Sequence, residues 1–197
     1  ARANARNANQ SMTQQFKIVV VGPAGVGKTS VIRRIVQHKF EYNYKQTVGV
    51  DFSILWVTDQ RTRVKTQLQF WDLAGQESIN ALSKVYFKNA NGCLLVLDGA
   101  ATSQEECEKW VSAIRQQPTF PIPIRVLVNK CDMPTFRNEL IDYIQREFGL
   151  FGVKTSALTG ENVLQCVEEV VAEIRGKKVE QIQLPQILVQ EKGRCCW

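Results

Sequence analysis

Lys28 and Thr29 end the glycine-rich stretch Gly22-Pro-Ala-Gly-Val-Gly-Lys-Thr, and their side chains suit phosphate binding. The glycines at 22, 25 and 27 let the backbone curl so that several NH groups face one anion. A lysine at this spacing meets the β- and γ-phosphates of a nucleotide, and the following hydroxyl can ligate a magnesium ion that bridges them. The candidate nucleotide ligands in this stretch are Gly22, Ala24, Gly25, Val26, Gly27, Lys28, Thr29 and Ser30.

A carboxylate, Asp72, follows the apolar stretch that ends at Trp71. An acidic residue at the end of a strand can point toward a phosphate loop and hold magnesium through water. Asp72 could instead serve only as a helix cap, but the phosphate loop earlier in the chain favours the metal role.

The stretch Asn129-Lys130-Cys131-Asp132 predicts which base is bound. The Asp132 carboxylate can accept hydrogen bonds from the ring NH and the exocyclic amine of guanine, whereas adenine would leave it unpaired. This disfavours an ATP-using enzyme. We expect Ser156 and the backbone NH of Ala157 to support the base, and Phe40 either to stack on it or simply to pack within its loop.

Alternating apolar and amphipathic segments must position these residues. One early hairpin interrupts the alternation, which predicts an α/β fold: a doubly wound, mostly parallel sheet with one antiparallel edge strand and helices on both faces. All the polar stretches above fall where ligands bind such sheets, at the carboxyl ends of strands. Strands are expected at 16–21, 50–57, 64–71, 92–97, 122–128 and 150–154, and helices at 30–38, up to about 88, at 103–116, at 137–147 and around 163–174.

The composition fits one domain with short tails. No stretch of 18 apolar residues and no signal peptide is visible, so a cytosolic protein is expected. The net charge of +6 comes mainly from the two ends, which fits a basic tail beside a membrane anchor better than a nucleic-acid groove. Cys93, Cys107 and Cys166 are expected to be buried thiols and Cys131 a loop thiol, in a reducing compartment.

Taken together, the glycine-rich loop, Thr47, Asp72-x-x-Gly75-Gln76, Asn129-Lys-x-Asp132 and Thr155-Ser-Ala resemble the five guanine-nucleotide motifs of the Ras superfamily of small GTPases, over residues 16–176. Within it, Thr47-Val-Gly-Val-Asp-Phe52 and Trp71-Asp-x-Ala-Gly-Gln-Glu77 resemble the Rab branch. The resemblance implies a six-stranded P-loop GTPase fold that binds GTP or GDP with Mg²⁺. It implies a metal site at Thr29, Thr47 and Asp72, catalytic roles for Lys28, Thr47 and Gln76, and further nucleotide contacts from Tyr44, Gly75 and Lys130.

By the same resemblance, the loop around Thr47 and the loop around Gln76 are switches that change shape on hydrolysis. Lys45 stands where heterotrimeric G-protein α subunits carry a catalytic arginine, so slow intrinsic turnover and dependence on an activating protein are expected. Leu73 and Ser78-Ile79 depart from the usual Rab residues and put activator and effector preference in doubt. Leu73, Pro121-Ile-Pro123 and Phe148-Gly-Leu-Phe-Gly152 resemble the Rab subgroup that serves lysosome-related organelles.

The two ends of the chain differ in their sequence pattern from residues 16–176. Residues 1–15 lack apolar periodicity and are expected to be disordered, and the part before Met12 could precede the native start. The segment 177–197 is expected to be a flexible tail, and its Cys195-Cys196 pair resembles the geranylgeranylated pair of Rabs. Because Trp197 follows that pair, two unmodified thiols remain the alternative.

The function implied is that of a monomeric, lipid-anchored switch on the cytoplasmic face of endomembranes, acting in vesicle transport. Its implied partners are an exchange factor, an activating protein, effectors, a GDP-dissociation inhibitor and the prenylation machinery, and no nucleic acid. The alternative is a guanine-nucleotide-binding docking module that hydrolyses little GTP.

Overall fold

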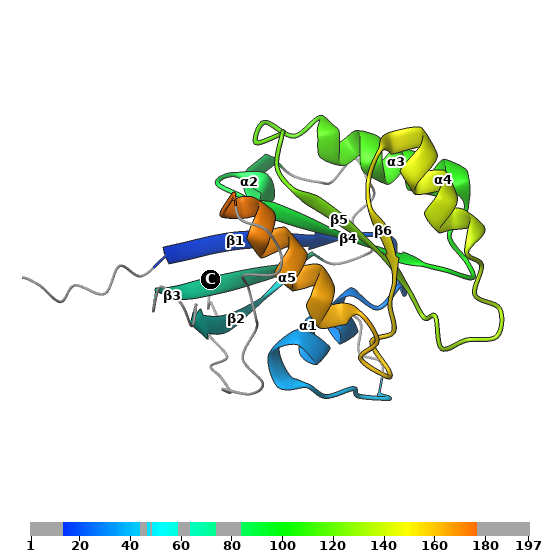
Figure 1. Ribbon diagram of the computed structural model, residues 1–197, viewed down its shortest axis with the longest axis horizontal. Coiled ribbons are helices and arrows are strands. Elements are labelled where there is room, and N and C mark those ends of the chain that lie inside the picture. Colours follow the sequence, from blue (N-terminus) through cyan, green and yellow to red (C-terminus); the bar gives the residue numbers. More distant parts are fainter. Residues whose placement is uncertain (1–13, 44–46, 48, 59–63, 74–83, 177–197) are drawn as a thin grey trace, which may run out of the picture.

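The computed structural model describes residues 14–176 except 44–46, 48, 59–63 and 74–83. The described part forms a six-stranded sheet in the order β2-β3-β1-β4-β5-β6 (Figure 1). Every neighbouring pair is parallel except β2 and β3, which are antiparallel. The mostly parallel sheet with one antiparallel edge strand is therefore confirmed. The strands are β1 Gln14–Val21, β2 Val50–Thr58, β3 Lys65–Leu73, β4 Gly92–Asp98, β5 Ile124–Asn129 and β6 Gly152–Lys154.

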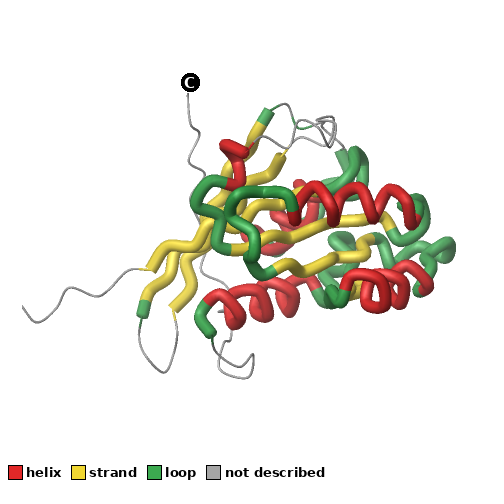
Figure 2. The backbone as a smooth tube through the Cα atoms, turned by 90° about the horizontal axis from the view of Figure 1, so that it is seen from above, coloured by secondary structure: helices red, strands yellow, loops and turns green. Residues whose placement is uncertain are grey.

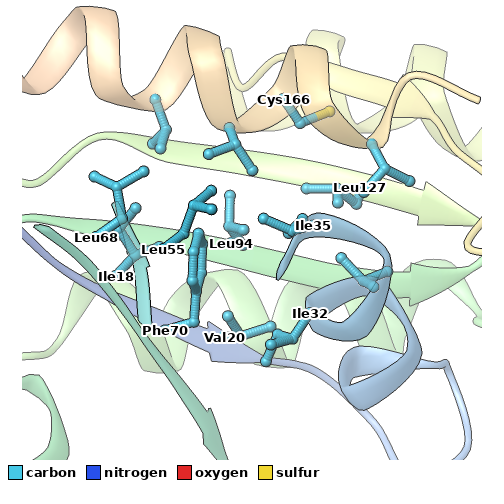
Figure 3. Packing of buried hydrophobic residues seen from close by; sticks show 14 of the residues in the cluster. Ile18, Val20, Ile32, Ile35, Leu55, Leu68, Phe70, Leu94, Leu127 and Cys166 are labelled. Carbon is cyan, nitrogen blue, oxygen red and sulfur yellow. The ribbon is translucent and has the colours of Figure 1, made fainter. Parts of the chain in front are cut away.

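Helices cover both faces of the sheet (Figure 2). They are α1 Lys28–Gln37, α2 Lys84–Phe87, α3 Gln104–Arg115, α4 Glu139–Phe148 and α5 Val163–Ile174. One core packs α1 and α5 against the sheet, with Phe70 and Leu94 fully buried between them (Figure 3). The other core packs α2, α3 and α4 against the opposite face. Because both faces of the central strands are covered, β4 is buried along its whole length.

The expectation that residues 1–15 are disordered is wrong for the last two of them. Gln14 and Gln15 extend β1, where they pair with Thr66 and Gln67 of β3. The Gln15 amide also donates to Gln67 Oε1 at 2.8 Å. Two polar residues thus continue a strand because the neighbouring strand supplies hydrogen-bond partners, which an apolar pattern does not reveal.

The remaining expectations about the ends, residues 1–13 and the tail 177–197 with Cys195 and Cys196, lie outside the described residues. Cys93, Cys107 and Cys166 are buried and free, as predicted, and Cys131 lies in the turn after β5, as predicted, where it is free and half-buried. Within the described part of the chain, no helix has the length and apolarity needed to cross a membrane.

The sheet topology determines where a ligand can bind. In the sheet, β1 lies between β3 and β4. The chain goes from β1 through α1 to the β2-β3 pair on one side and then crosses to β4 on the other side, so the connections leave the centre of the sheet in opposite directions. A crevice opens at such a point, beyond the carboxyl ends of the strands. The loop after β1, the end of β3 and the loop after β5 all lie at this edge.

Candidate functional site

A pocket of about 330 Å³ lies at this edge of the sheet. Its wall comes from the loop after β1, the start of α1, the segment 40–43 with Thr47, and the loops after β5 and β6. The sequence-predicted residues that line it are Ala24, Gly25, Gly27, Lys28, Thr29, Ser30, Phe40, Thr47, Asn129, Lys130, Asp132 and Ala157. Tyr44, Gly75 and Gln76 lie outside the described residues.

The loop after β1 needs glycine for steric reasons. Gly22 has φ +143°, and a Cβ there would lie 2.0 Å from the Val96 carbonyl oxygen of β4. Gly27 has φ +98°, and a Cβ there would lie 2.7 Å from the Asn129 amide nitrogen. Both glycines therefore permit a close approach of the loop to the strands behind it.

Lys28 is buried at the first position of α1, and its Nζ donates to the Gly22 and Pro23 carbonyl oxygens, each at 2.8 Å. Burial lowers the pKa of Lys28 to about 8, although the nearby Asp72 carboxylate acts in the opposite direction. An ammonium that loses hydration in this way gains from a phosphate as a partner, since the phosphate replaces the lost water.

Three oxygen-bearing side chains meet beside Lys28. Thr29 Oγ1 donates to Asp72 Oδ2 at 2.5 Å and lies 2.8 Å from Thr47 Oγ1. The other carboxylate oxygen of Asp72 is buried and has no hydrogen-bond partner. Burial raises the pKa of Asp72 to about 6, and the Thr29 hydroxyl and Lys28 oppose this rise. The three residues predicted as metal ligands are therefore in one cluster.

This cluster fits a hard cation such as Mg²⁺. Hydroxyl and carboxylate oxygens are the ligands it prefers, and it usually takes few of them from protein. The unpartnered Asp72 oxygen is a polar group whose burial cost a cation would offset. Among the described residues there is no group of three His, Cys, Asp or Glu side chains that could hold a metal, so the cation would depend on hydroxyls and on the ligand's own oxygens.

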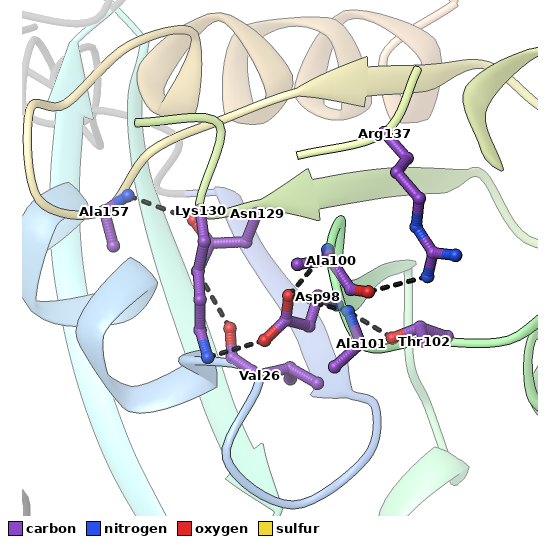
Figure 4. Close-up of polar contacts among 9 residues, drawn as sticks. All are labelled: Val26, Asp98, Ala100, Ala101, Thr102, Asn129, Lys130, Arg137 and Ala157. Atoms are coloured by element: carbon purple, nitrogen blue, oxygen red, sulfur yellow. Dashed lines mark hydrogen bonds and ion pairs between the residues drawn. The ribbon is translucent and has the colours of Figure 1, made fainter. Parts of the chain in front are cut away.

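Asn129 joins the phosphate side of the pocket to its far side. Its amide donates to the Val26 carbonyl oxygen at 2.8 Å, and its Oδ1 accepts from the Ala157 amide at 3.0 Å (Figure 4). The sequence predicted the Ala157 NH as a donor to the base, but in this structure that NH is paired with Asn129. Asp132 Oδ1 accepts from Ser156 Oγ at 2.5 Å, which explains the position of Ser156 behind the pocket rather than in its wall.

Asp98, at the end of β4, is a residue that the sequence reasoning missed. Its Oδ2 lies 2.6 Å from Lys130 Nζ, and its Oδ1 accepts from the amides of Ala100 and Ala101 at 2.8 and 3.2 Å (Figure 4). Burial acts to raise the pKa of Asp98, but Lys130 and the two amides outweigh it and hold that pKa below its usual range. Asp98 follows an apolar strand as Asp72 does, so the same signal could have found it.

The pocket wall also contains residues that no motif singled out. All but one of them lie outside the helices and strands, and the exception, Arg33, lies in α1. Their identities are Arg33, Glu41, Tyr42, Asn43, Met133 and Leu158. Arg33 and Glu41 form an ion pair at 2.7 Å in this wall. The Phe40 and Tyr42 rings pack edge to face, with centroids 5.2 Å apart.

Comparison with known proteins identifies a matching family and several similar sequences. Residues 17–176 match the model of the Ras family. The chain is 33% identical to human Ras-related protein Rab-32, over 98% of this chain and 95% of that protein. It is 33% identical to human Ras-related protein Rab-7L1 over 85% and 86% of the two chains. Ras-related protein Rab-32A of Dictyostelium discoideum is 42% identical over 60% of this chain and 56% of its own length.

Proposed function

The chain belongs to the Ras family, as a Rab-like small GTPase of membrane trafficking, and from this premise we propose how its residues divide the work. Residues 22–30 hold the phosphates of GTP or GDP. Thr29, Thr47 and Asp72 hold Mg²⁺. The loops after β5 and β6 hold the guanine. The G domain of this proposal is 16–176, extended by Gln14 and Gln15 through their pairing in β1.

The single observation that carries the proposal is the placement of Thr29 Oγ1 between Asp72 and Thr47. These residues are 43 and 18 positions from Thr29 in the chain, so only the fold brings them together. When bound, Mg²⁺ supplies positive charge to the β- and γ-phosphate oxygens. Thr29 and Asp72 then orient that charge, while the Lys28 ammonium stabilises the negative charge that develops during hydrolysis.

The guanine side follows from Asp132. Its carboxylate, oriented by Ser156, would accept from the ring NH and the exocyclic amine of guanine. Asn129, Lys130 and Phe40 line the same pocket, and Phe40 would cover the base. Adenine offers no such donor pair, so it would leave a desolvated carboxylate unpaired.

Hydrolysis needs an oriented water. By family resemblance, Gln76 places this water, and Thr47 couples the γ-phosphate to the shape of its loop. Lys45 cannot make the bidentate contact of an arginine, so turnover is slow until an activating protein supplies what is missing. Tyr44 and Gly75 would complete the nucleotide contacts.

We further propose a lipid anchor at Cys195 and Cys196, since two chains give durable attachment. The anchored monomer would act on the cytoplasmic face of endomembranes, with lysosome-related organelles as the candidate compartment. Its partners would be an exchange factor, an activating protein, effectors, a GDP-dissociation inhibitor and the prenylation machinery. The similarity to Rab-32 proteins supports this assignment.

The test begins with the purified full chain. After denaturation, the released nucleotide is identified, and GTP turnover is then followed in single-turnover mode for wild type and Gln76→Leu, with and without a Rab-type activating protein. We expect bound guanine nucleotide, release accelerated by EDTA, and slow turnover that Gln76→Leu lowers about tenfold or more. Bound guanine nucleotide with no turnover under any condition would favour a docking module. Bound adenine nucleotide would contradict the role of Asp132.

A further inference from the structure

Arg34, in the last turn of α1, contacts three backbone carbonyls with three different nitrogens. Its Nε donates to the Ala157 oxygen at 2.9 Å, and its Nη2 donates to the Leu158 oxygen at 2.5 Å. Its Nη1 donates to the His38 oxygen at 2.9 Å. A guanidinium is the side chain suited to this, because its donors are fixed in one plane and its charge strengthens each bond.

Each of these carbonyls lies beside a wall of the pocket. Ala157 and Leu158 are themselves part of the wall. His38 ends α1 with φ +55°, and its NH bonds back to the Arg34 carbonyl oxygen. Two residues later the chain reaches Phe40, which lines the pocket. Through these hydrogen bonds, Arg34 connects the segment that leads to Phe40 with the loop after β6.

The loop held by Arg34 also orients Asp132. Ser156 precedes Ala157 and donates to Asp132 Oδ1 at 2.5 Å. The Gly160 amide donates to the Ser156 carbonyl oxygen at 2.8 Å, and a Cβ on Gly160 would lie 3.4 Å from Arg34 Cδ. The Arg34 side chain therefore packs under the turn that presents Ser156, in addition to bonding its carbonyls.

We propose that Arg34 is a positioning residue for nucleotide retention: it clamps the two walls of the guanine pocket together and so slows the release of GDP. The inference rests on the proposed function, since it assumes that guanine occupies this end of the pocket. None of the three Arg34 hydrogen bonds involves Thr29, Thr47 or Asp72, so loss of the clamp affects the base and leaves the phosphate chemistry unchanged.

The test uses the full chain loaded with fluorescent GDP or fluorescent inosine diphosphate, which lacks the exocyclic amine from which Asp132 would accept a hydrogen bond. Release rates are measured for wild type, Arg34→Ala and Arg34→Lys. The matched control is Arg115→Ala, because Arg115 also joins a helix to a backbone carbonyl, that of Phe148 at 2.7 Å, and does not line the pocket. Hydrolysis of prebound GTP in a single turnover and the unfolding temperature are measured on the same samples.

We expect GDP release to accelerate about tenfold or more in Arg34→Ala, within the range usual for coupling between two sites. Arg34→Lys should release GDP at an intermediate rate, because one ammonium cannot serve three separated carbonyls. The preference for GDP over inosine diphosphate should shrink in both variants, and single-turnover hydrolysis should stay within about twofold of wild type. Arg115→Ala should change neither release nor preference.

Release within about twofold of wild type in Arg34→Ala would overturn the proposal, as would equal acceleration in Arg115→Ala. If Arg34→Ala does not fold, a wild-type release rate in Arg34→Lys overturns it instead. Failure of the proposed function is distinguishable, because fluorescent ADP is measured alongside on wild type, which in that case would not retain GDP in preference to ADP.

Discussion

Replacing Asp98 by asparagine should loosen the nucleotide without breaking the loop after β4. The asparagine oxygen can still accept from the amides of Ala100 and Ala101, which Asp98 Oδ1 does now. The other side-chain atom becomes an NH₂ group, and it would face the Lys130 ammonium that now lies 2.6 Å from Asp98 Oδ2. Lys130 has φ +68°, a backbone conformation that is uncommon for a residue other than glycine.

The size of the effect can be estimated from this pair. A hydrogen bond between charged groups contributes about 1.5–3 kcal/mol. The Lys130 side chain is 33% exposed and that of Asp98 is 11% exposed, so water recovers part of the loss. We therefore expect GDP binding to weaken by about 1–2 kcal/mol, which corresponds to about 5- to 30-fold in affinity.

The assay is the release rate and the equilibrium affinity of fluorescent GDP, with the unfolding temperature measured in parallel. Glu169→Gln is the matched control, because Glu169 forms a comparable ion pair with Arg125 at 3.2 Å and does not line the pocket. The control should lose some stability and keep its GDP affinity. GDP affinity within about twofold of wild type in Asp98→Asn would refute the reasoning that the carboxylate positions Lys130.

Three further predictions concern the phosphate end of the pocket. Burial raises the pKa of Asp72 to about 6. The affinity of the GDP complex for Mg²⁺ should therefore decrease as the pH is lowered from about 7 to about 5, because Asp72 becomes protonated. Asp72→Asn should remove this pH dependence in a Mg²⁺ titration. Because that pKa lies above the ordinary value of 3.8 for an aspartate, Asp72 stabilises the nucleotide-free fold fully below pH 3.8 and loses this contribution as pH rises through about 6. Gly22→Ala should destabilise by about 4 kcal/mol or more in thermal unfolding, because its Cβ would lie 2.0 Å from the Val96 oxygen. Gly25→Ala, where the new Cβ would have no atom within 4 Å apart from those of its chain neighbours, should cost only about 1–2 kcal/mol, and equal losses would contradict the steric argument.

Much of the fold could be predicted because burial has a local signature. The apolar stretches of β1 and β4 and the one-sided apolar face of α5 follow from which faces of each element are covered. The order of strands and helices then restricts the topology to a doubly wound sheet. The boundaries were less predictable, since α1 begins at Lys28 rather than Ser30, at a point that the left-handed Gly27 determines.

The candidate site could likewise be predicted only in part from the sequence. The sequence alone determined the residue types that chemistry demands, such as Lys28 and Thr29 after three glycines and Asp132 after a strand. These can be read locally because phosphate and guanine each require particular donors and acceptors at short spacing. The sequence could also have indicated Asp98, because this residue follows an apolar stretch as Asp72 does.

Only the tertiary structure decided which of these groups meet. Arg34 contacts carbonyls more than 120 positions later in the chain, and the Ala157 amide pairs with Asn129. Gln14 and Gln15 join a strand because β3 lies beside them. Such contacts depend on how the elements pack. The local sequence around a polar side chain without a periodic pattern does not indicate which distant group will become its hydrogen-bond partner.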